Sequence, residues 1–296
     1  MHIPVLVKEA VNLLVSDPKG VYVDATVGAG GHAKAILSRL APEGKLIAFD
    51  WDQEALAYAK NNLAFYVASE KVVFCHANFV SLESNLLKLG FRRVHGVLLD
   101  LGLSSLQIDS LDRGFSFRFD APLDMRFDQS QRLTAADFVN SESREKLAWI
   151  FREYGEEKRA EFFARKILEA RKKHKIRTTF ELLGALGLPQ TGRFRLHPAT
   201  KVFMALRIAV NNELANIEQV LPQAVRLLER GGRLVVISFH SLEDRIVKNF
   251  FKEEKKRGTV RILTKKVIKP SFRDIQSNPR ARSAKLRAVE KIASSG

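Results

Sequence analysis

One stretch, Val21–His32, constrains the fold of this chain more than any other. Its first three residues are β-branched or aromatic, as in a buried strand, and Asp24 follows them. The turn after this acid holds three glycines: Gly28, Gly30 and Gly31. Apolar residues then recur at helical spacing over 33–40, and a second apolar run, Leu46–Asp50, ends in another acid. Strand, glycine turn, helix and acidic strand end predict a half-unit that binds a nucleotide-like ligand.

Two details of the glycine turn bear on which ligand it binds. The dinucleotide fingerprint has a third glycine where this chain has Ala33. Asp24 lies at the tip of the first strand, where a carboxylate suits a ligand with a positive amino-acid end and repels a pyrophosphate. The sequence therefore favours S-adenosylmethionine, and NAD is the alternative.

The chain around this unit alternates between strand and helix patterns. Strands are expected at 72–75, 96–100 and 234–238, and helices at 53–63, 81–89 and 217–228. Val260–Lys266 and Leu286–Lys291 have the composition of a closing antiparallel pair. This alternation predicts an α/β fold, a Rossmann-like parallel sheet with helices on both faces.

The pattern breaks after Asp100. Leu101–Asp128 is rich in Gly, Ser, Asp and Phe without periodicity, and predicts a long functional loop. Helices are expected at 141–154, 156–173 and 180–188, and another from Pro198 through Leu214. We therefore predict three parts: 1–107 and 208–296 as the two pieces of the sheet domain, and 108–207 as an inserted, mostly helical substrate-recognition domain.

Charge separates these parts. The net charge is +16, yet Arg245–Gly296 alone carries +12 and Arg152–Arg207 carries +8, which leaves −4 for the rest. Two basic segments beside an acidic ligand-binding part indicate a polyanionic partner, of which nucleic acid is the foremost.

Composition excludes several other classes. The single cysteine, Cys75, excludes an internal disulfide, and no group of residues has metal-ligand spacing, so no metal is expected. No apolar stretch reaches membrane-spanning length, and the N-terminal residues lack the pattern of a signal or transit peptide. We expect a cytoplasmic protein that does not contact a membrane.

Acids at strand ends define the expected site. Parallel strands present their carboxyl ends at one edge, so Asp24, Asp50 and Asp100 should converge there, with His240 after the last strand. We expect Asp50 to bind the ribose and Phe79 to lie beside the adenine. Asp100, assisted by Ser104 or Ser105, could hold the N–H of an exocyclic amine and turn its lone pair toward a methyl group.

The irregular segment after Asp100 holds aromatic and cationic residues in alternation. Phe115 and Phe117 lie among Arg113 and Arg126, which suits stacking on an unpaired base beside phosphates; packing beneath the inserted domain is the alternative. Asp124 and Arg126 could form an ion pair within this loop. For His32 we expect a structural or cofactor-edge role, and for His240 either a site or a packing role.

Several long blocks of the sequence resemble one known family, the bacterial small-subunit ribosomal RNA cytosine-N4 methyltransferases (RsmH or MraW family). The blocks are DATVGAGGH (Asp24–His32), LLDLGLSS (Leu98–Ser105), RGFSF (Arg113–Phe117), PLDMRFD (Pro122–Asp128), HPATKVFMALRIAVNNEL (His197–Leu214), GGRLVVISFHSLEDRIVK (Gly231–Lys248) and NPRARSAKLRA (Asn278–Ala288). They follow one another in order over nearly the whole chain.

The resemblance implies a specific activity. It is methyl transfer from S-adenosylmethionine to N4 of a cytidine in the P-site decoding centre of 16S rRNA, within the small ribosomal subunit. The cofactor contacts that it implies are Gly30, Gly31, His32, Asp50, Phe79, Asp100 and Gln107. The family also carries a helical domain inserted in its methyltransferase sheet.

Two rival functions remain at this point. One is an NAD-dependent oxidoreductase, and the other is a non-catalytic RNA-binding assembly factor that retains the fold. The sequence sets no oligomeric state, and a homodimer stays open.

Overall fold

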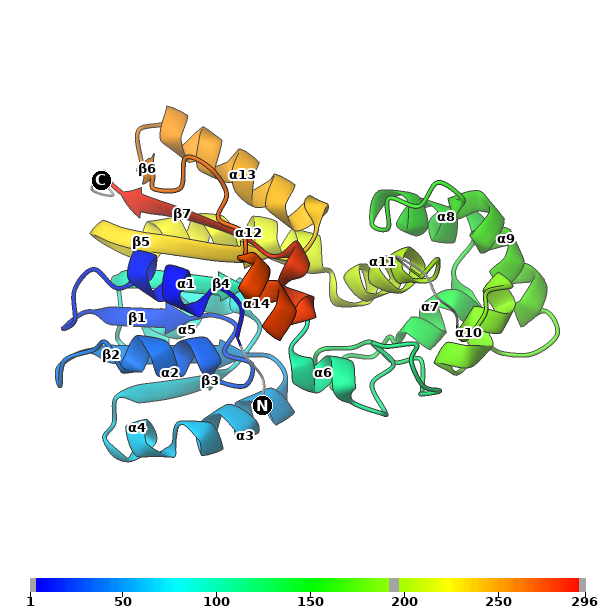
Figure 1. Ribbon diagram of the computed structural model, residues 1–296, viewed down its shortest axis with the longest axis horizontal. Helices are drawn as coiled ribbons and strands as arrows, with labels where there is room; N and C mark the ends of the chain where they lie inside the picture. Colours follow the sequence, from blue (N-terminus) through cyan, green and yellow to red (C-terminus); the bar gives the residue numbers. More distant parts are fainter. Residues whose placement is uncertain (1–3, 192–196, 293–296) are drawn as a thin grey trace. The chain divides into compact units, whose positions relative to one another are not determined.

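The chain folds as two compact units, shown in Figure 1. The computed structural model describes residues 4–191 and 197–292, although the Ser105 side chain lies outside what it describes. Met1–Gly102 and Leu214–Gly296 form one unit, here called the sheet unit. Leu103–Glu213 form the other, here called the helical unit.

A single mixed sheet organises the sheet unit. Within the described residues it has seven strands in the order β3-β2-β1-β4-β5-β7-β6. The strands are β1 (Val21–Asp24), β2 (Lys45–Asp50), β3 (Val72–His76), β4 (Val94–Asp100), β5 (Leu228–Ser238), β6 (Val260–Ile262) and β7 (Lys285–Lys291). Strands β1 to β5 pair in parallel, whereas β7 runs antiparallel to both β5 and β6. The carboxyl ends of β2, β1 and β4 therefore lie side by side at one edge.

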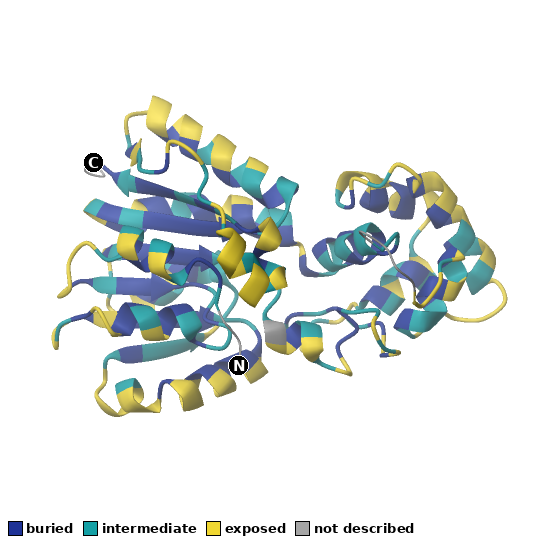
Figure 2. Ribbon diagram, in the orientation of Figure 1, coloured by how far each residue is buried: buried dark blue, intermediate teal, exposed yellow. Residues whose placement is uncertain are grey.

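Helices cover both faces of this sheet. Because successive side chains of a strand point to opposite faces, Leu46 and Ala48 join one apolar cluster while Ile47 and Phe49 join another. The first cluster takes residues from α1 (Val7–Leu14), α2 (Gly31–Leu37) and α3 (Gln53–Asn62). The second takes them from α5 (Leu82–Lys88), α12 (Glu213–Leu227) and α13 (Ser241–Lys256). Figure 2 shows the resulting buried strands, and the α/β prediction is confirmed.

Short elements complete the sheet unit. They are α4 (Ala64–Ala68), η1 (Phe79–Ser81), α14 (Phe272–Ser277) and η2 (Pro279–Ser283).

The helical unit packs around α9. Its helices are α6 (Ser105–Asp109), α7 (Ala135–Ser141), α8 (Arg144–Glu153), α9 (Ala160–Arg171), α10 (Thr179–Leu186) and α11 (Thr200–Asn211). Helix α9 contacts α7, α8 and α10, and α11 packs on α7 and α8. Local signals fix several ends: Thr178 and Glu181 form a capping box at the start of α10, and Gly187 ends that helix at φ 68°.

The elements differ from those expected at five places. Helix α6 lies inside the expected loop because Ser104 and Gln107 form a capping box, and Thr134 and Asp137 start α7 in the same way. The helix expected through Leu214 ends at Asn211, since Asn212 is left-handed at φ 52°, and α12 begins at Glu213. No element is predicted for the stretch that forms α13. Strand β5 begins at Leu228, six residues early, with a register irregularity near Gly231.

Candidate active site

The glycine turn forms a tight connection between β1 and α2. Gly28 and Gly30 have φ angles of 50° and 85°, a region that glycine enters at little cost. A Cβ on Gly31 would lie 2.1 Å from Pro4 Cγ, so only glycine fits there without a shift. The Gly28 amide donates to Asp50 Oδ2 at 2.8 Å. This bond ties the turn to the end of β2 and holds it beside the acid expected to bind a ribose.

Three carboxyl groups meet at the carboxyl edge of β2, β1 and β4, as the sequence predicts. Burial raises the pKa of Asp24 to about 7 and that of Asp50 to about 6. Burial, together with the charge of Glu243, raises the pKa of Asp100 to about 8. Asp24 Oδ2 and Asp100 Oδ1 are buried and accept no hydrogen bond from the described residues. Such carboxyl groups are destabilising as anions unless a cation or donor joins them.

His32 lies on α2 against two of these groups. Its Nε2 is 3.0 Å from the Val5 carbonyl oxygen, so Nε2 carries the proton that it donates there. Its Nδ1 then faces Asp100 Oδ2 at 3.4 Å. Burial lowers the pKa of this histidine, although Asp24 opposes the effect. A neutral imidazole beside a protonated Asp100 is the arrangement that these contacts favour.

The adenine side of the expected site holds two rings. Phe79 begins η1 directly after β3, and its ring lies 6.3 Å from that of Trp51, centroid to centroid. Trp51 follows Asp50, and the sequence reasoning missed it. An aromatic residue next to the ribose acid is the signal that could have found it.

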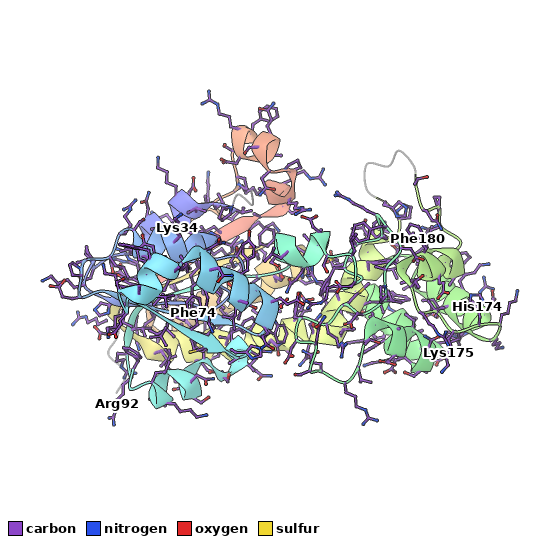
Figure 3. All side chains as sticks on the ribbon, turned by 90° about the horizontal axis from the view of Figure 1, so that it is seen from below. Lys34, Phe74, Arg92, His174, Lys175 and Phe180 are labelled. Carbon is purple, nitrogen blue, oxygen red and sulfur yellow. The ribbon has the colours of Figure 1, made fainter. Side chains whose placement is uncertain are left out.

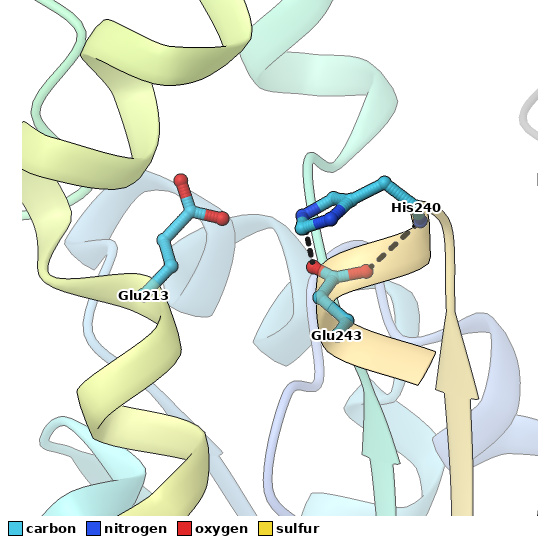
Figure 4. A group of neighbouring side chains, drawn as sticks. All are labelled: Glu213, His240 and Glu243. Atoms are coloured by element: carbon cyan, nitrogen blue, oxygen red, sulfur yellow. Dashed lines mark hydrogen bonds and ion pairs between the residues drawn. The ribbon is translucent and has the colours of Figure 1, made fainter. Parts of the chain in front are cut away.

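His240 and Glu243 lie at the start of α13 (Figure 4). Glu243 is completely buried, and its Oε2 accepts the Phe239 amide at 2.7 Å and the His240 amide at 3.3 Å. His240 Nε2 lies 3.1 Å from Glu243 Oε1. Glu243 was missed because the sequence shows only an acid in the first turn of a helix. Its charge nonetheless raises the pKa of Asp100.

Two of the predicted residues of the helical unit cap a helix. Ser104 Oγ accepts the Gln107 amide at 3.2 Å, and Gln107 Oε1 accepts the Ser104 amide at 3.0 Å. Ser105 is the first residue of α6, and its side chain lies outside the described structure. The roles predicted for these three residues toward cofactor and substrate stay predictions.

The predicted aromatic and arginine segment packs inside the helical unit. Arg113 is 1% exposed and donates to the carbonyls of Arg126 and Phe127 at 2.8 and 3.0 Å. Phe115 is 8% exposed and stacks on Phe127 with 5.5 Å between centroids. The burial of Arg113 and Phe115 gives no support to the RNA contact predicted for them.

The other two residues of that segment also make internal contacts. Phe117 lies 4.7 Å from His197 and 4.9 Å from Phe203, centroid to centroid. Arg126 forms a two-point ion pair with Asp124, at 2.8 and 2.7 Å, as expected from the sequence. Ring contacts and an ion pair within the helical unit therefore hold this loop in place.

The sheet-unit residues fit S-adenosylmethionine. Its ammonium group and its sulfonium are cationic, which suits the unpartnered oxygens of Asp24 and Asp100. Each Asp50 oxygen accepts a backbone amide, from Gly28 and Asp52, and keeps a lone pair for a ribose hydroxyl. Asp24, at the tip of β1, would repel the pyrophosphate of a dinucleotide. The site therefore disfavours NAD.

Comparison with known proteins agrees with S-adenosylmethionine as the cofactor of this site. The family model described as the MraW methylase family matches residues 1–292. The "Ribosomal RNA small subunit methyltransferase H" of Geotalea daltonii is 47% identical, covering 98% of each chain. The protein of the same name from Caldicellulosiruptor bescii is 45% identical, covering 98% of this chain and 99% of its own.

The fold also has solved counterparts. A structure described as an rRNA-methylase candidate from Clostridium thermocellum aligns over 100% of both chains with a TM-score of 0.50 and 12% identity. At that identity the likeness concerns the fold alone.

Among the described helices, none is long and apolar enough to cross a bilayer.

Proposed function

This chain belongs to the MraW methylase family, and from that premise we propose that it transfers methyl from S-adenosylmethionine to N4 of a cytidine in small-subunit ribosomal RNA. The observation that carries the proposal is the cluster of Asp24, Asp50 and Asp100 beside the glycine turn. Relatives named as small-subunit rRNA methyltransferases, 45–47% identical over 98% of this chain, supply the substrate class. We further place the target in the P-site decoding centre of 16S rRNA and the protein in the cytoplasm.

Different residues of the site bind different parts of the cofactor and orient the amine. Gly28, Gly30 and Gly31 allow the backbone to approach the cofactor closely, while Asp50 holds its ribose and Phe79 its adenine. When bound, S-adenosylmethionine supplies a methyl group on a charged sulfonium leaving group, so the transfer needs an oriented nucleophile. We assign that orientation to Asp100.

The role of Asp100 follows from the chemistry of the amine. The lone pair of an exocyclic amine is conjugated into the ring, and an acceptor that holds its N–H turns the lone pair outward. A protonated carboxyl is a poor acceptor, and burial keeps Asp100 largely protonated at pH 7, with a pKa of about 8. A positive charge beside Asp100 lowers its pKa and creates the acceptor. His32 Nδ1 lies 3.4 Å from Asp100 Oδ2 and, as a neutral imidazole, accepts a hydrogen bond from the protonated carboxyl until a bound cation displaces that proton.

The helical unit is the proposed substrate-recognition domain. We propose that assembled small subunits are the substrate, and that residues 108–207 recognise them.

The proposed homodimer is tested by measuring the mass of the protein in solution.

Calorimetric titration tests the cofactor assignment. S-adenosylmethionine should bind and release protons, since the carboxyl groups ionise beside a cation, whereas NAD should give no heat. Binding of NAD alone would favour the oxidoreductase. In the same series Asp100→Asn should still bind the cofactor but methylate slowly, and full methylation by this variant would remove the role assigned to Asp100.

A further inference from the structure

Two aromatic side chains of the helical unit are partly exposed to solvent. Trp149 on α8 is 41% exposed and Phe162 on α9 is 40% exposed, although their neighbours Leu147, Ile150 and Phe163 are buried. Figure 2 shows exposed residues along both helices. Single exposed rings are common, so exposure alone does not indicate a partner.

Cations accompany both rings. Lys146 Nζ lies 4.7 Å from the centre of the Trp149 ring. Arg165 and Lys166 lie 5.7 and 5.8 Å from the centre of the Phe162 ring. These pairs are three or four residues apart, the spacing that places side chains together on a helix. Each ring is therefore bordered by positive charge on its own helix.

Contacts between and beside the helices hold this surface in place. Arg152, one turn beyond Trp149, lies 3.6 Å from Glu161, the residue before Phe162. The ion pair thus bridges α8 and α9 within one turn of both rings. Tyr154 meets Trp149 edge to face at 5.0 Å and restricts the indole. The two rings are presented by a packed helix pair and not by a loop.

The same helix pair is strongly basic. Arg144–Lys175 contains eleven Lys and Arg against six Asp and Glu, a net charge of +5. The turn after α9, Lys172–Lys175, is exposed, and Figure 3 shows His174 and Lys175 pointing outward from it. We call Lys146, Trp149, Phe162, Arg165 and Lys166 the cation–aromatic face.

A charged single strand is the partner that this face fits. Bases stack on exposed aromatic rings, and neighbouring Lys and Arg bind the phosphates on either side. Lys is depleted in protein–protein interfaces, whereas Lys146 and Lys166 lie beside the two rings. The net charge of the segment favours a polyanion.

We propose that the cation–aromatic face binds an unpaired segment of the substrate rRNA, with bases stacked on Trp149 and Phe162. The inference rests on the proposed function for the identity of the RNA, and it places an RNA contact on α8–α9, away from the buried Arg113 and Phe115.

The test uses the full-length chain with Trp149→Ala, Phe162→Ala and the double variant. Each ring should cost about 10-fold in affinity for small-subunit rRNA measured by filter binding, and the double variant more. Trp149→Phe should restore most of the affinity because it retains a ring. Phe65→Ala removes a ring that is 78% exposed on α4 of the sheet unit, and as the matched control it should bind RNA as the wild type does.

Kinetics separate RNA binding from catalysis. The double variant should raise the KM for small subunits while kcat and the affinity for S-adenosylmethionine stay unchanged. RNA affinity and KM equal to those of the wild type would overturn the inference while methylation by the wild type still supported the proposed function. Failure of the wild type to methylate small-subunit rRNA would instead refute the proposed function.

Cross-linking identifies the class of partner directly. A benzophenone side chain placed at position 149 should cross-link to rRNA in a mixture with small subunits. Cross-linking to a ribosomal protein alone would show that the face docks on protein and would overturn the inference.

Discussion

Replacement of Asp100 by Asn makes the sharpest test of the electrostatics of the site. The Asn amide has nearly the same shape as the Asp carboxyl group, but it has no proton that titrates. In the folded protein burial and Glu243 raise the pKa of Asp100 to about 8, far above the ordinary value of 3.8. The carboxyl is therefore neutral at pH 7 when folded and ionised when unfolded.

The sign of the effect on stability follows from proton counting. Between pH 3.8 and about 8 the folded chain holds one more proton at Asp100 than the unfolded chain, so unfolding releases it. The stabilisation of the folded chain by this proton is fully present below pH 3.8, and it is lost as the pH rises through about 8. Its slope is at most about 1.4 kcal/mol per pH unit. The Asn variant lacks this slope, and its stability relative to the wild type should increase by a few kcal/mol from pH 5 to pH 8.

The assay is urea denaturation of both proteins without cofactor at several pH values. Glu218→Gln, which removes an exposed carboxylate from α12, controls for the loss of one negative charge. A difference between Asp100→Asn and wild type that does not change with pH would refute the reasoning, since it would mean that Asp100 is already ionised at pH 5 in the folded protein.

Three further predictions concern packing and charge. Gly114→Ala should lower the free energy of unfolding by at least about 2 kcal/mol, because its Cβ would lie 2.2 Å from the Pro122 carbonyl oxygen at φ 66°; Gly258→Ala, at φ 74° with open space, should cost less in the same denaturation series. Asn211→Ala should cost about 1–3 kcal/mol for each backbone group left unpaired at Phe127 and Met125, and an unchanged denaturation midpoint would contradict this. Affinity for rRNA should fall steeply between low and high salt in filter binding, and a flat dependence would count against phosphate contacts.

The sheet and the position of the three acids could be predicted because strand periodicity and strand ends are local features. Asp24, Asp50 and Asp100 each end an apolar run, and parallel pairing brings them together. Capping boxes such as Thr134 with Asp137 are also local, and these were readable although the helices that they start were not predicted.

Other features depend on partners far away in the chain. Arg113 is buried because the Arg126 and Phe127 carbonyls turn toward it. Asn211 holds that turn by accepting the Phe127 amide and donating to the Met125 carbonyl, about 85 residues away in sequence. Aromatic and arginine alternation was therefore interpreted as an RNA contact where the fold makes a buried network. Exposure of Trp149 and Phe162 likewise follows from how α8 and α9 pack, and the sequence alone did not single them out.

The most direct test of the proposed function is transfer of labelled methyl from S-adenosylmethionine to small ribosomal subunits from a strain that lacks this gene, followed by nucleoside analysis of the RNA. We expect label in N4-methylcytidine at one site in the decoding centre. Label in a different nucleoside, or none in the presence of a bound cofactor, would contradict the assignment of this chain as an rRNA cytosine-N4 methyltransferase.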